Sequence, residues 1–242
     1  MIEINDLHKT FGTVRAVDGV SFAAGDGRIT GLLGPNGAGK STTLRILYTV
    51  LKPDRGTAMI DGVDVINDSL NARARIGTLP HGSGLYPHLT ARENIRYYAR
   101  LYGVATDKIE ERIERLIDEL DFREVADRRT HGFSQGQRTK VALARALVHN
   151  PQNIVLDEPS NGLDVMATRS LRELVRTLRD AGRCVLFSSH VMQEVAALCD
   201  EIVIIAGGRV ALQNSPEGIR NSTGCDDLED AFVKAIAHAS AA

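Results

Sequence analysis

A glycine-rich run that ends in lysine, serine and threonine is the strongest chemical signal in the chain. It fits the pattern G-x-x-x-x-G-K-[ST] and lies between an apolar strand pattern and a strong helix pattern. Its glycines let the backbone turn tightly and aim N–H groups at an anion. Lys40 can reach the β- and γ-phosphates of a nucleotide, and Ser41 Oγ is placed to bind Mg²⁺. The predicted nucleotide-binding residues are Gly34, Pro35, Asn36, Gly37, Ala38, Gly39, Lys40, Ser41 and Thr42.

Two carboxylates follow a buried-strand pattern at residues 153–156. They are Asp157 and Glu158. Ligands of parallel sheets gather beyond the carboxyl ends of the strands, where the phosphate loop is also expected. Asp157 suits Mg²⁺, which prefers oxygen ligands and keeps several waters, and Glu158 is then free to polarise an attacking water as a general base. Such a pair is common at strand ends, and the phosphate loop is what turns it into a predicted hydrolysis site.

A histidine follows a second strand pattern, at residues 185–189. His190 is therefore expected at the same edge of the sheet, within reach of a γ-phosphate. A lone histidine in this place is more often a structural or surface residue. The accompanying motifs favour a catalytic role here.

A serine begins another strong helix pattern. Ser134, with Gln137 three places on, forms a capping box, so one interpretation is simply a well-capped helix. An exposed helix N-terminus with Ser134 and Gly136 beside it is also an anion site. One chain offers this site no obvious phosphate, whereas a second copy packed head to tail would supply one.

The elements that must position these residues alternate between strand and helix patterns. Strands are expected at residues 1–7, 14–22, 29–33, 57–60, 153–156, 184–188 and 202–206, and helices at 41–51, 167–181 and 191–198, with a helical region at 89–148. Such alternation favours a parallel sheet with helices on both faces. Within the helical region, Thr90 and Glu93 predict a capping box. The apolar stripe at 109–120 leaves charged residues that are expected to form a solvated face.

Composition limits the class of protein. The chain has 242 residues and a formal net charge of -2, which argues against nucleic acid as a partner. Its three cysteines are far apart, which favours reduced thiols in a cytosolic compartment over disulfides or a zinc site. The apolar runs are strand-sized, whereas a membrane span needs about 20 apolar residues. If the chain serves a membrane process, another chain is expected to supply the pore.

The order and spacing of these motifs resemble the nucleotide-binding domain of ABC (ATP-binding cassette) proteins. The resemblance extends from Ile2 to about Arg220, and its most specific part is the signature at residues 133–137, which other P-loop families lack. It implies an α/β P-loop NTPase fold: a RecA-like parallel-sheet core, an N-terminal antiparallel β subdomain and an inserted α-helical subdomain at about 86–150. We expect a single domain over residues 1–225 and a short helical extension over residues 226–242.

The resemblance also implies roles for individual residues. Phe11 looks like the aromatic platform that stacks on adenine, and His190 like the switch histidine. Ser134 and Gly136 would bind the γ-phosphate held by the opposite subunit, and Asp164 would couple the two sites across the dimer. Hydrolysis then needs two subunits closed around two ATP molecules with Mg²⁺.

Two positions depart from the common family pattern. His81 stands where the family usually has a glutamine that senses Mg²⁺ and water, and imidazole titrates near neutrality. This suggests pH-sensitive coupling, or simply a tolerated substitution, and the ATPase pH profiles of the wild type and His81→Gln would distinguish the two. Gln135 replaces the usual second glycine of the signature, as in one branch of ABC exporters.

Residues 84–95 and 133–141 resemble the ATPase subunits of sodium-extrusion (Nat-type) ABC systems. We therefore expect a cytoplasmic ATPase, peripheral on the inner face of the cell membrane, that energises export through a separate integral-membrane permease. Its second expected partner is another nucleotide-binding subunit, in a head-to-tail homodimer. Alternatives are an exporter ATPase for a drug, lipid or polysaccharide, a soluble ABC protein that does not transport, and a small P-loop kinase, which would have no use for the signature helix.

Overall fold

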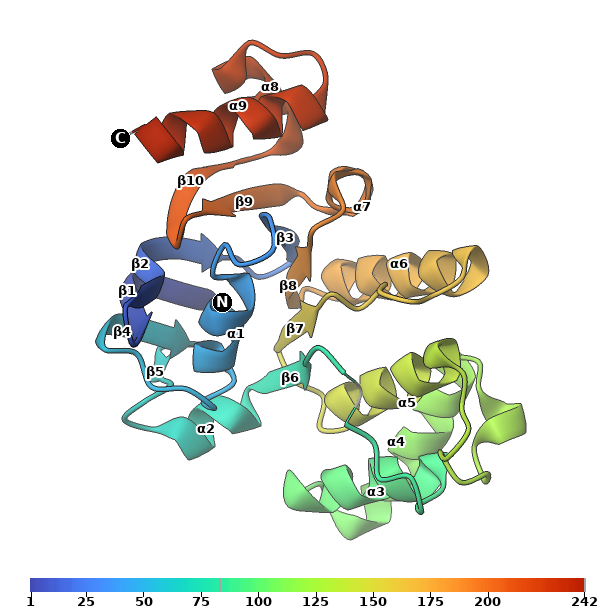
Figure 1. Ribbon diagram of the computed structural model, residues 1–242. Coiled ribbons are helices and arrows are strands. Elements are labelled where there is room, and N and C mark those ends of the chain that lie inside the picture. Colours follow the sequence, from blue (N-terminus) through green and yellow to red (C-terminus); the bar gives the residue numbers. More distant parts are fainter. Residues whose placement is uncertain (83, 242) are drawn as a thin grey trace.

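The chain folds around two β-sheets (Figure 1). The computed structural model describes residues 1–82 and 84–241. In this part of the chain, an antiparallel sheet has the order β2-β1-β4-β5 and a second sheet has the order β10-β9-β3-β8-β7-β6. The first contains β1 (Ile2–Phe11), β2 (Val14–Ala24), β4 (Arg55–Ile60) and β5 (Val63–Asp64). The second contains β3 (Arg28–Leu33), β6 (Ile76–Leu79), β7 (Asn153–Asp157), β8 (Cys184–Ser189), β9 (Glu201–Ala206) and β10 (Arg209–Asn214).

The second sheet is parallel except for β10, which runs antiparallel to β9. Its central strands are mostly apolar because both of their faces are covered, and most of their polar residues lie near the strand ends. Ile154 and Leu156 belong to one buried apolar cluster, shared with the helices on one side, whereas Val155 belongs to the other cluster, shared with α1 and the antiparallel sheet. The confirmed fold class is therefore the expected mixed α/β arrangement of a P-loop NTPase.

The register of the parallel strands places their carboxyl ends side by side. Leu33 at the end of β3 pairs with Ser189 at the end of β8, and Asp157 at the end of β7 pairs with Ser188. The phosphate loop leaves from β3, Glu158 follows β7, and His190 follows β8. One edge of one sheet thus gathers the three segments that carry the chemistry predicted from the sequence.

A helical lobe is inserted between β6 and β7, in the lower right of Figure 1. It contains α3 (Ala91–Leu101), α4 (Thr106–Glu119), a 3₁₀ turn (Arg123–Val125) and α5 (Gln135–Leu147). The apolar stripe of α4 is buried as expected, through Ile109, Ile113, Leu116 and Ile117. The predicted capping box at the start of α3 is present, since Glu93 N–H donates to Thr90 Oγ1 and Thr90 N–H donates to Glu93 Oε2.

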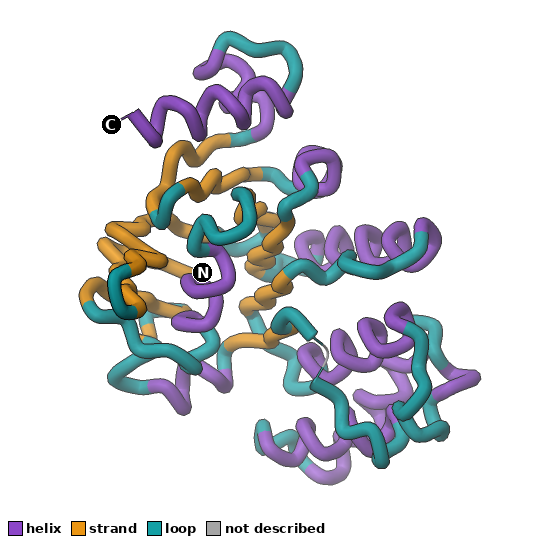
Figure 2. The backbone as a smooth tube through the Cα atoms, viewed as in Figure 1, coloured by secondary structure: helices purple, strands orange, loops and turns teal. Residues whose placement is uncertain are grey.

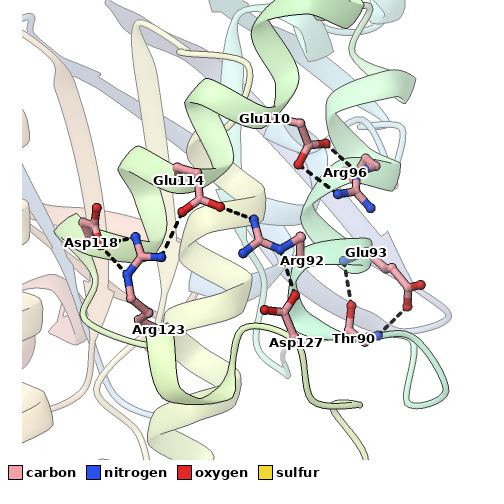
Figure 3. Close-up of polar contacts among 9 residues, drawn as sticks. All are labelled: Thr90, Arg92, Glu93, Arg96, Glu110, Glu114, Asp118, Arg123 and Asp127. Atoms are coloured by element: carbon pink, nitrogen blue, oxygen red, sulfur yellow. Dashed lines mark hydrogen bonds and ion pairs between the residues drawn. The ribbon is translucent and has the colours of Figure 1, made fainter.

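Ion pairs join the polar faces of this lobe (Figure 3). Arg92 of α3 bonds Glu114 of α4 and Asp127 of the following loop, at 2.5 and 2.9 Å. Arg96 donates hydrogen bonds to both carboxylate oxygens of Glu110, at 2.6 and 2.9 Å. Part of the face expected to be solvated is therefore used to tie helices together. The carboxylates of these pairs are exposed to solvent, so each pair contributes little alone and the buried stripe carries most of the stability.

The remaining helices cover the sheets, as Figure 2 shows in purple around the orange strands. They are α1 (Lys40–Leu47), α2 (Ser69–Ala74), α6 (Val165–Asp180), α7 (Met192–Leu198), α8 (Pro216–Thr223) and α9 (Leu228–Ala241). Helix α1 is shorter than predicted because Thr49 adopts a left-handed backbone conformation, with φ of 62°. Among the described residues, none of these helices is both long and apolar enough to cross a lipid bilayer.

The C-terminal segment packs against the core. Helix α9 contacts β9 and β10, and its Leu228 and Ala231 join the same apolar cluster as Ile219 of α8. The division of the chain at residue 225 stays a prediction, and Ala242, the last residue of the predicted extension, lies outside the described residues.

A partly buried histidine lies at the junction between α5 and β6. His149 stacks on Tyr102, with ring centroids 3.8 Å apart, and its Nε2 bonds the carbonyl oxygen of Ile76 at 3.1 Å. Burial lowers the pKa of His149 from 6.5 to about 4, although the bond to Ile76 opposes the shift. The His149 imidazole therefore binds a proton at lower pH in the folded chain than in the unfolded chain.

We expect this histidine to make the fold sensitive to acid. Between pH 6.5 and about 4 the unfolded state binds the extra proton, so the free energy of unfolding should fall with pH, by up to about 3 kcal/mol from this residue. His149→Phe keeps the stacked ring and should flatten that slope in urea titrations taken at several pH values. The exposed His88→Phe is the matched control and should leave the slope unchanged. An unchanged slope in His149→Phe would remove His149 from the explanation.

Candidate nucleotide-binding and hydrolysis site

The phosphate loop connects β3 to α1 and is held by close backbone contacts. Gly39, at the N-cap of α1, has φ of 106°, and a Cβ there would lie 2.4 Å from the carbonyl oxygen of Ala16 in β2. A Cβ at Gly34 would lie 2.2 Å from the carbonyl oxygen of Ile205 in β9. The loop thus needs glycine in two places because neighbouring backbone occupies the space that a side chain would fill.

Lys40 is folded inward at the start of α1. Its side chain is 5% exposed, and Nζ donates to the carbonyl oxygens of Gly34 at 2.6 Å and Pro35 at 3.1 Å. Burial lowers the pKa of Lys40, while the nearby charges of Glu158 and Asp157 oppose the shift. To bind a phosphate, the Lys40 ammonium would have to break its hydrogen bonds to these two carbonyl oxygens.

Gly39→Ala should damage the loop more than Gly37→Ala. Both positions have positive φ, but a Cβ at Gly37 meets no atom within 4 Å, whereas at Gly39 it meets the Ala16 carbonyl. The shared backbone strain costs about 1–3 kcal/mol, and only Gly39→Ala adds a steric clash with rigid backbone. Urea denaturation and titration with a fluorescent ATP analogue would measure both effects. Equal losses in the two variants would show that the contact with Ala16 contributes nothing.

A serine organises the two carboxylates. Ser188 Oγ donates to Asp157 Oδ1 at 2.7 Å and accepts the Glu158 N–H at 3.0 Å. Asp157 is 4% exposed, and Glu158 has the uncommon φ of 49°. Sequence reasoning missed Ser188 because its role depends on strand register. The available signal was a small polar residue at the end of a buried strand.

His190 lies against Glu158. Its Nδ1 is 3.0 Å from Glu158 Oε1, with the imidazole about half exposed and the carboxylate largely buried. The structure therefore brings together the predicted general base and the predicted switch histidine, which are 32 positions apart in the sequence. A small cavity of about 200 Å³ borders both residues, together with Ser160 and Glu194.

A larger cavity of about 510 Å³ brings His81 to the carboxylates. Asp157, Glu158 and Gln135 line it with His81. No cluster of three or more His, Cys, Asp or Glu side chains suited to a metal ion occurs among the described residues. The exposed Ser41 hydroxyl and the buried Asp157 carboxylate fit Mg²⁺, which takes few protein ligands besides water and phosphate oxygens. The assignment of His81 as a metal sensor stays a prediction.

Ser134, Gly136 and Asp164 border a different cavity from the one that Gln135 shares with the carboxylates. Ser134 caps α5, since its Oγ accepts the Gln137 N–H at 3.2 Å, and Asp164 caps α6, since its Oδ1 accepts the Ala167 N–H at 2.8 Å. Both border a cavity of about 500 Å³ that Gly136 also lines. Helices α5 and α6 lie on the right of Figure 1, away from α1. Within one chain, the structure does not bring Ser134, Gly136 and Asp164 to the phosphate loop.

Phe11 projects from the end of β1. Its side chain is 47% exposed, and Lys9 Nζ lies 5.6 Å from the centre of its ring. An exposed aromatic ring beside a phosphate-binding fold suits stacking on a base, and this role stays a prediction.

Comparison with known proteins settles the family. The model of the ABC transporter family matches residues 17–161. This chain belongs to the ABC transporter family. It is 40% identical to the ABC transporter ATP-binding protein NatA of Bacillus subtilis, over 98% of each chain. It is also 36% identical to the Nod factor export ATP-binding protein I of Ralstonia nicotianae, over 95% of this chain and 72% of that protein.

Solved structures agree with this membership. A dimeric ATP-binding cassette in a post-hydrolysis state, bound to ADP and Pi, superposes with a TM-score of 0.81 at 25% identity, over 89% of this chain and 98% of that one. This member of the ABC family is an ATP-binding subunit and an ATPase.

Proposed function

We propose that this ABC ATPase energises export through a separate membrane permease, and that Na⁺ is the ion exported. The observation that carries the hydrolytic part is the single sheet edge at which Lys40, Glu158 and His190 meet. The choice of export is supported by a relative whose name includes export, the Nod factor protein. The choice of Na⁺ is supported by the resemblance to Nat-type subunits and the 40% identity to NatA.

Glu158 is the proposed general base. Its carboxylate is largely buried and is paired with His190, while its backbone N–H is fixed by Ser188. This holds the acceptor oxygen in one place, so that it can take a proton from a water attacking the γ-phosphate. His190 faces Glu158 through Nδ1, so it would donate to the phosphate from Nε2 with both ring nitrogens carrying a proton, and Lys40 binds the β- and γ-oxygens once it leaves the loop carbonyls.

Mg²⁺ is the proposed metal cofactor, with Ser41 and Asp157 as its protein ligands. When bound, it would neutralise phosphate charge. Asp157 suits this role because Ser188 fixes its Oδ1, while no hydrogen bond from the residues that the structure describes occupies Oδ2.

Two copies of the chain complete each site. Ser134 uses one lone pair to cap α5, so its hydroxyl proton remains free to donate to a phosphate oxygen. Helices α5 and α6, whose N-terminal residues border the same cavity as Ser134, lie away from α1 in Figure 1. A head-to-tail homodimer would bring Ser134 and Gly136 of one copy to the nucleotide of the other, with Asp164 between the two sites.

The permease is the proposed second partner. Tyr86 of the loop after β6 stacks edge-on with Tyr97 of α3 at 5.3 Å, and both rings are more than 40% exposed. Leu101, at the end of α3, is also exposed. Tyr86 and His81 both lie in the segment between β6 and α3. The exposed side chains of Tyr86, Tyr97 and Leu101 suit contact with cytoplasmic segments of a membrane protein. The subunit would then lie in the cytoplasm, peripheral on the inner face of the cell membrane.

The test is affinity purification of the tagged chain from detergent-solubilised native membranes, followed by mass spectrometry. We expect a multi-span membrane protein in comparable amount, and Na⁺ efflux by vesicles that contain both chains and ATP. Recovery of soluble chains alone would overturn the transporter proposal. ATP-dependent transport of a drug, lipid or polysaccharide by those vesicles, without Na⁺, would replace the cargo and keep the exporter.

A further inference from the structure

A carboxylate outside the proposed catalytic set joins the two loops that carry the catalytic residues. Glu194, in the first turn of α7, accepts two hydrogen bonds on one oxygen. Ser160 Oγ donates to Glu194 Oε2 at 2.6 Å, and Ser189 Oγ donates to the same atom at 3.1 Å. Ser160 lies after β7, between Glu158 and Asp164, and Ser189 immediately precedes His190. Two segments of the chain therefore converge on one atom, since Ser189 and Glu194 are 5 positions apart and Ser160 is 34 positions from Glu194.

The two neighbouring serines at the end of β8 bind different partners. Ser188 bonds Asp157 and the Glu158 backbone, whereas Ser189 bonds Glu194 and accepts the Val191 N–H at 3.0 Å. Ser189 Oγ thus fixes the backbone on the far side of His190. Because each hydroxyl carries one proton, the donation to Glu194 is what leaves its lone pairs turned toward Val191.

Ser160 belongs to the turn that follows Glu158, and backbone hydrogen bonds stabilise this turn. The Ser160 carbonyl oxygen accepts the Leu163 N–H at 3.0 Å, and the Asn161 N–H donates to the Glu158 carbonyl oxygen at 3.1 Å. This turn ends at Asp164, which caps α6. A displacement of Ser160 would therefore move Glu158 and Asp164 together.

We propose that Glu194 is a positioning residue. It fixes His190 against Glu158 and keeps the Ser160–Asp164 loop in a constant position relative to these two residues. The inference rests on the roles proposed above for Glu158 and His190. An ionised acceptor makes shorter and stronger hydrogen bonds than a neutral one, so a single carboxylate can hold two hydroxyls at once. Glu194 touches neither of the proposed reacting groups by a direct bond, and it acts through Ser160 and Ser189.

The first test compares steady-state ATP hydrolysis by the purified chain and two variants. Glu194→Ala should lower kcat by about 10–100-fold with KM within about threefold, because a displacement of about 1 Å at a reacting group costs rate more than binding. Glu194→Gln retains a carbonyl oxygen that can accept both hydroxyls and should recover most of the loss. Glu173→Ala, which removes a carboxylate exposed on α6, is the matched control and should not change kcat.

A second measurement keeps the inference testable if Glu194→Ala folds poorly. Ser160→Ala and Ser189→Ala each remove one donor. Each should lower kcat alone, whereas Ser160→Ala added to Glu194→Gln should lower kcat less than it does alone, since part of the bond is already weakened. Melting temperatures within a few degrees of the wild type would show that the fold is intact.

Three outcomes would overturn the inference: a kcat for Glu194→Ala within about twofold of wild type, equal losses in the Ala and Gln variants, or strictly additive effects of Ser160→Ala and Glu194→Gln. Glu158→Gln, measured in parallel, separates this result from the proposal on which it rests. Hydrolysis that persists in Glu158→Gln would refute the general base, whereas an inactive Glu158→Gln with an unaffected Glu194→Ala would refute only the positioning role.

Discussion

Glu158→Gln should lower the rate of ATP hydrolysis by about 10²–10⁴-fold, the usual contribution of a general base, and should leave ATP binding intact. The amide has nearly the same shape as the carboxylate and can still accept a hydrogen bond from His190 Nδ1. It cannot take a proton from water at neutral pH. Because γ-phosphate would then persist, the variant should accumulate as an ATP-bound dimer.

The measurement combines phosphate release with gel filtration in the presence and absence of ATP. Glu173→Gln, on the exposed face of α6, is the control and should hydrolyse ATP at the wild-type rate. Hydrolysis at more than about a tenth of the wild-type rate in Glu158→Gln would contradict the assigned role. Loss of hydrolysis without an ATP-dependent dimer would retain the base and contradict the two-copy site.

Lys40→Met should separate folding from function. The wild-type ammonium is buried against two carbonyls, and within the described part of the chain no carboxylate bonds it directly, so its desolvation is poorly compensated. Methionine has a similar length and no charge. The melting temperature without nucleotide should therefore stay within about 3 °C of the wild type or rise, since about 1 kcal/mol corresponds to 2–4 °C in a chain of this size.

ATP should no longer stabilise this variant. Loss of a cation that bonds phosphate oxygens removes about 1.5–3 kcal/mol per hydrogen bond, so the affinity for ATP should fall by about 100-fold or more. The check is the rise in melting temperature on adding ATP, which reports affinity by mass action. Lys52→Met, in an exposed loop, should keep the wild-type rise. A melting temperature well below that of the wild type would show instead that Lys40 is needed for the fold.

The residues that sequence reasoning located share one property: their roles follow from short motifs. Flanking residues predict a turn, a strand or a helix beside each of them, as for the phosphate loop, Asp157 and Glu158. Their partners have no such local signal. Ser188 acquires its role from the parallel register of β7 and β8, and Glu194 from the packing of α7 beside the β7 and β8 loops.

The fold shows the same division. The alternation of strands and helices indicated a parallel sheet, but the strand order did not follow, because β3 pairs with β8 and β9 from the far end of the chain. Strand β6 has four residues, and β10 does not alternate between buried and exposed positions, so neither carries a clear period-two pattern. The inward fold of Lys40 depends on side-chain rotamers, which a pattern of residue types does not specify.

The helical lobe is, in topological terms, one greatly enlarged crossover between neighbouring strands. It leaves from the end of β6 and returns at the start of β7, and these strands are paired from Ile76 with Asn153 to Leu79 with Leu156. A change in the lobe has to preserve that pairing and helix α5, whose N-terminus carries Ser134 and Gly136. Selection can therefore reshape α3 and α4 to recognise a new partner while the catalytic edge of the sheet is kept, and a lobe from another family member could be grafted between the end of β6 and the start of β7.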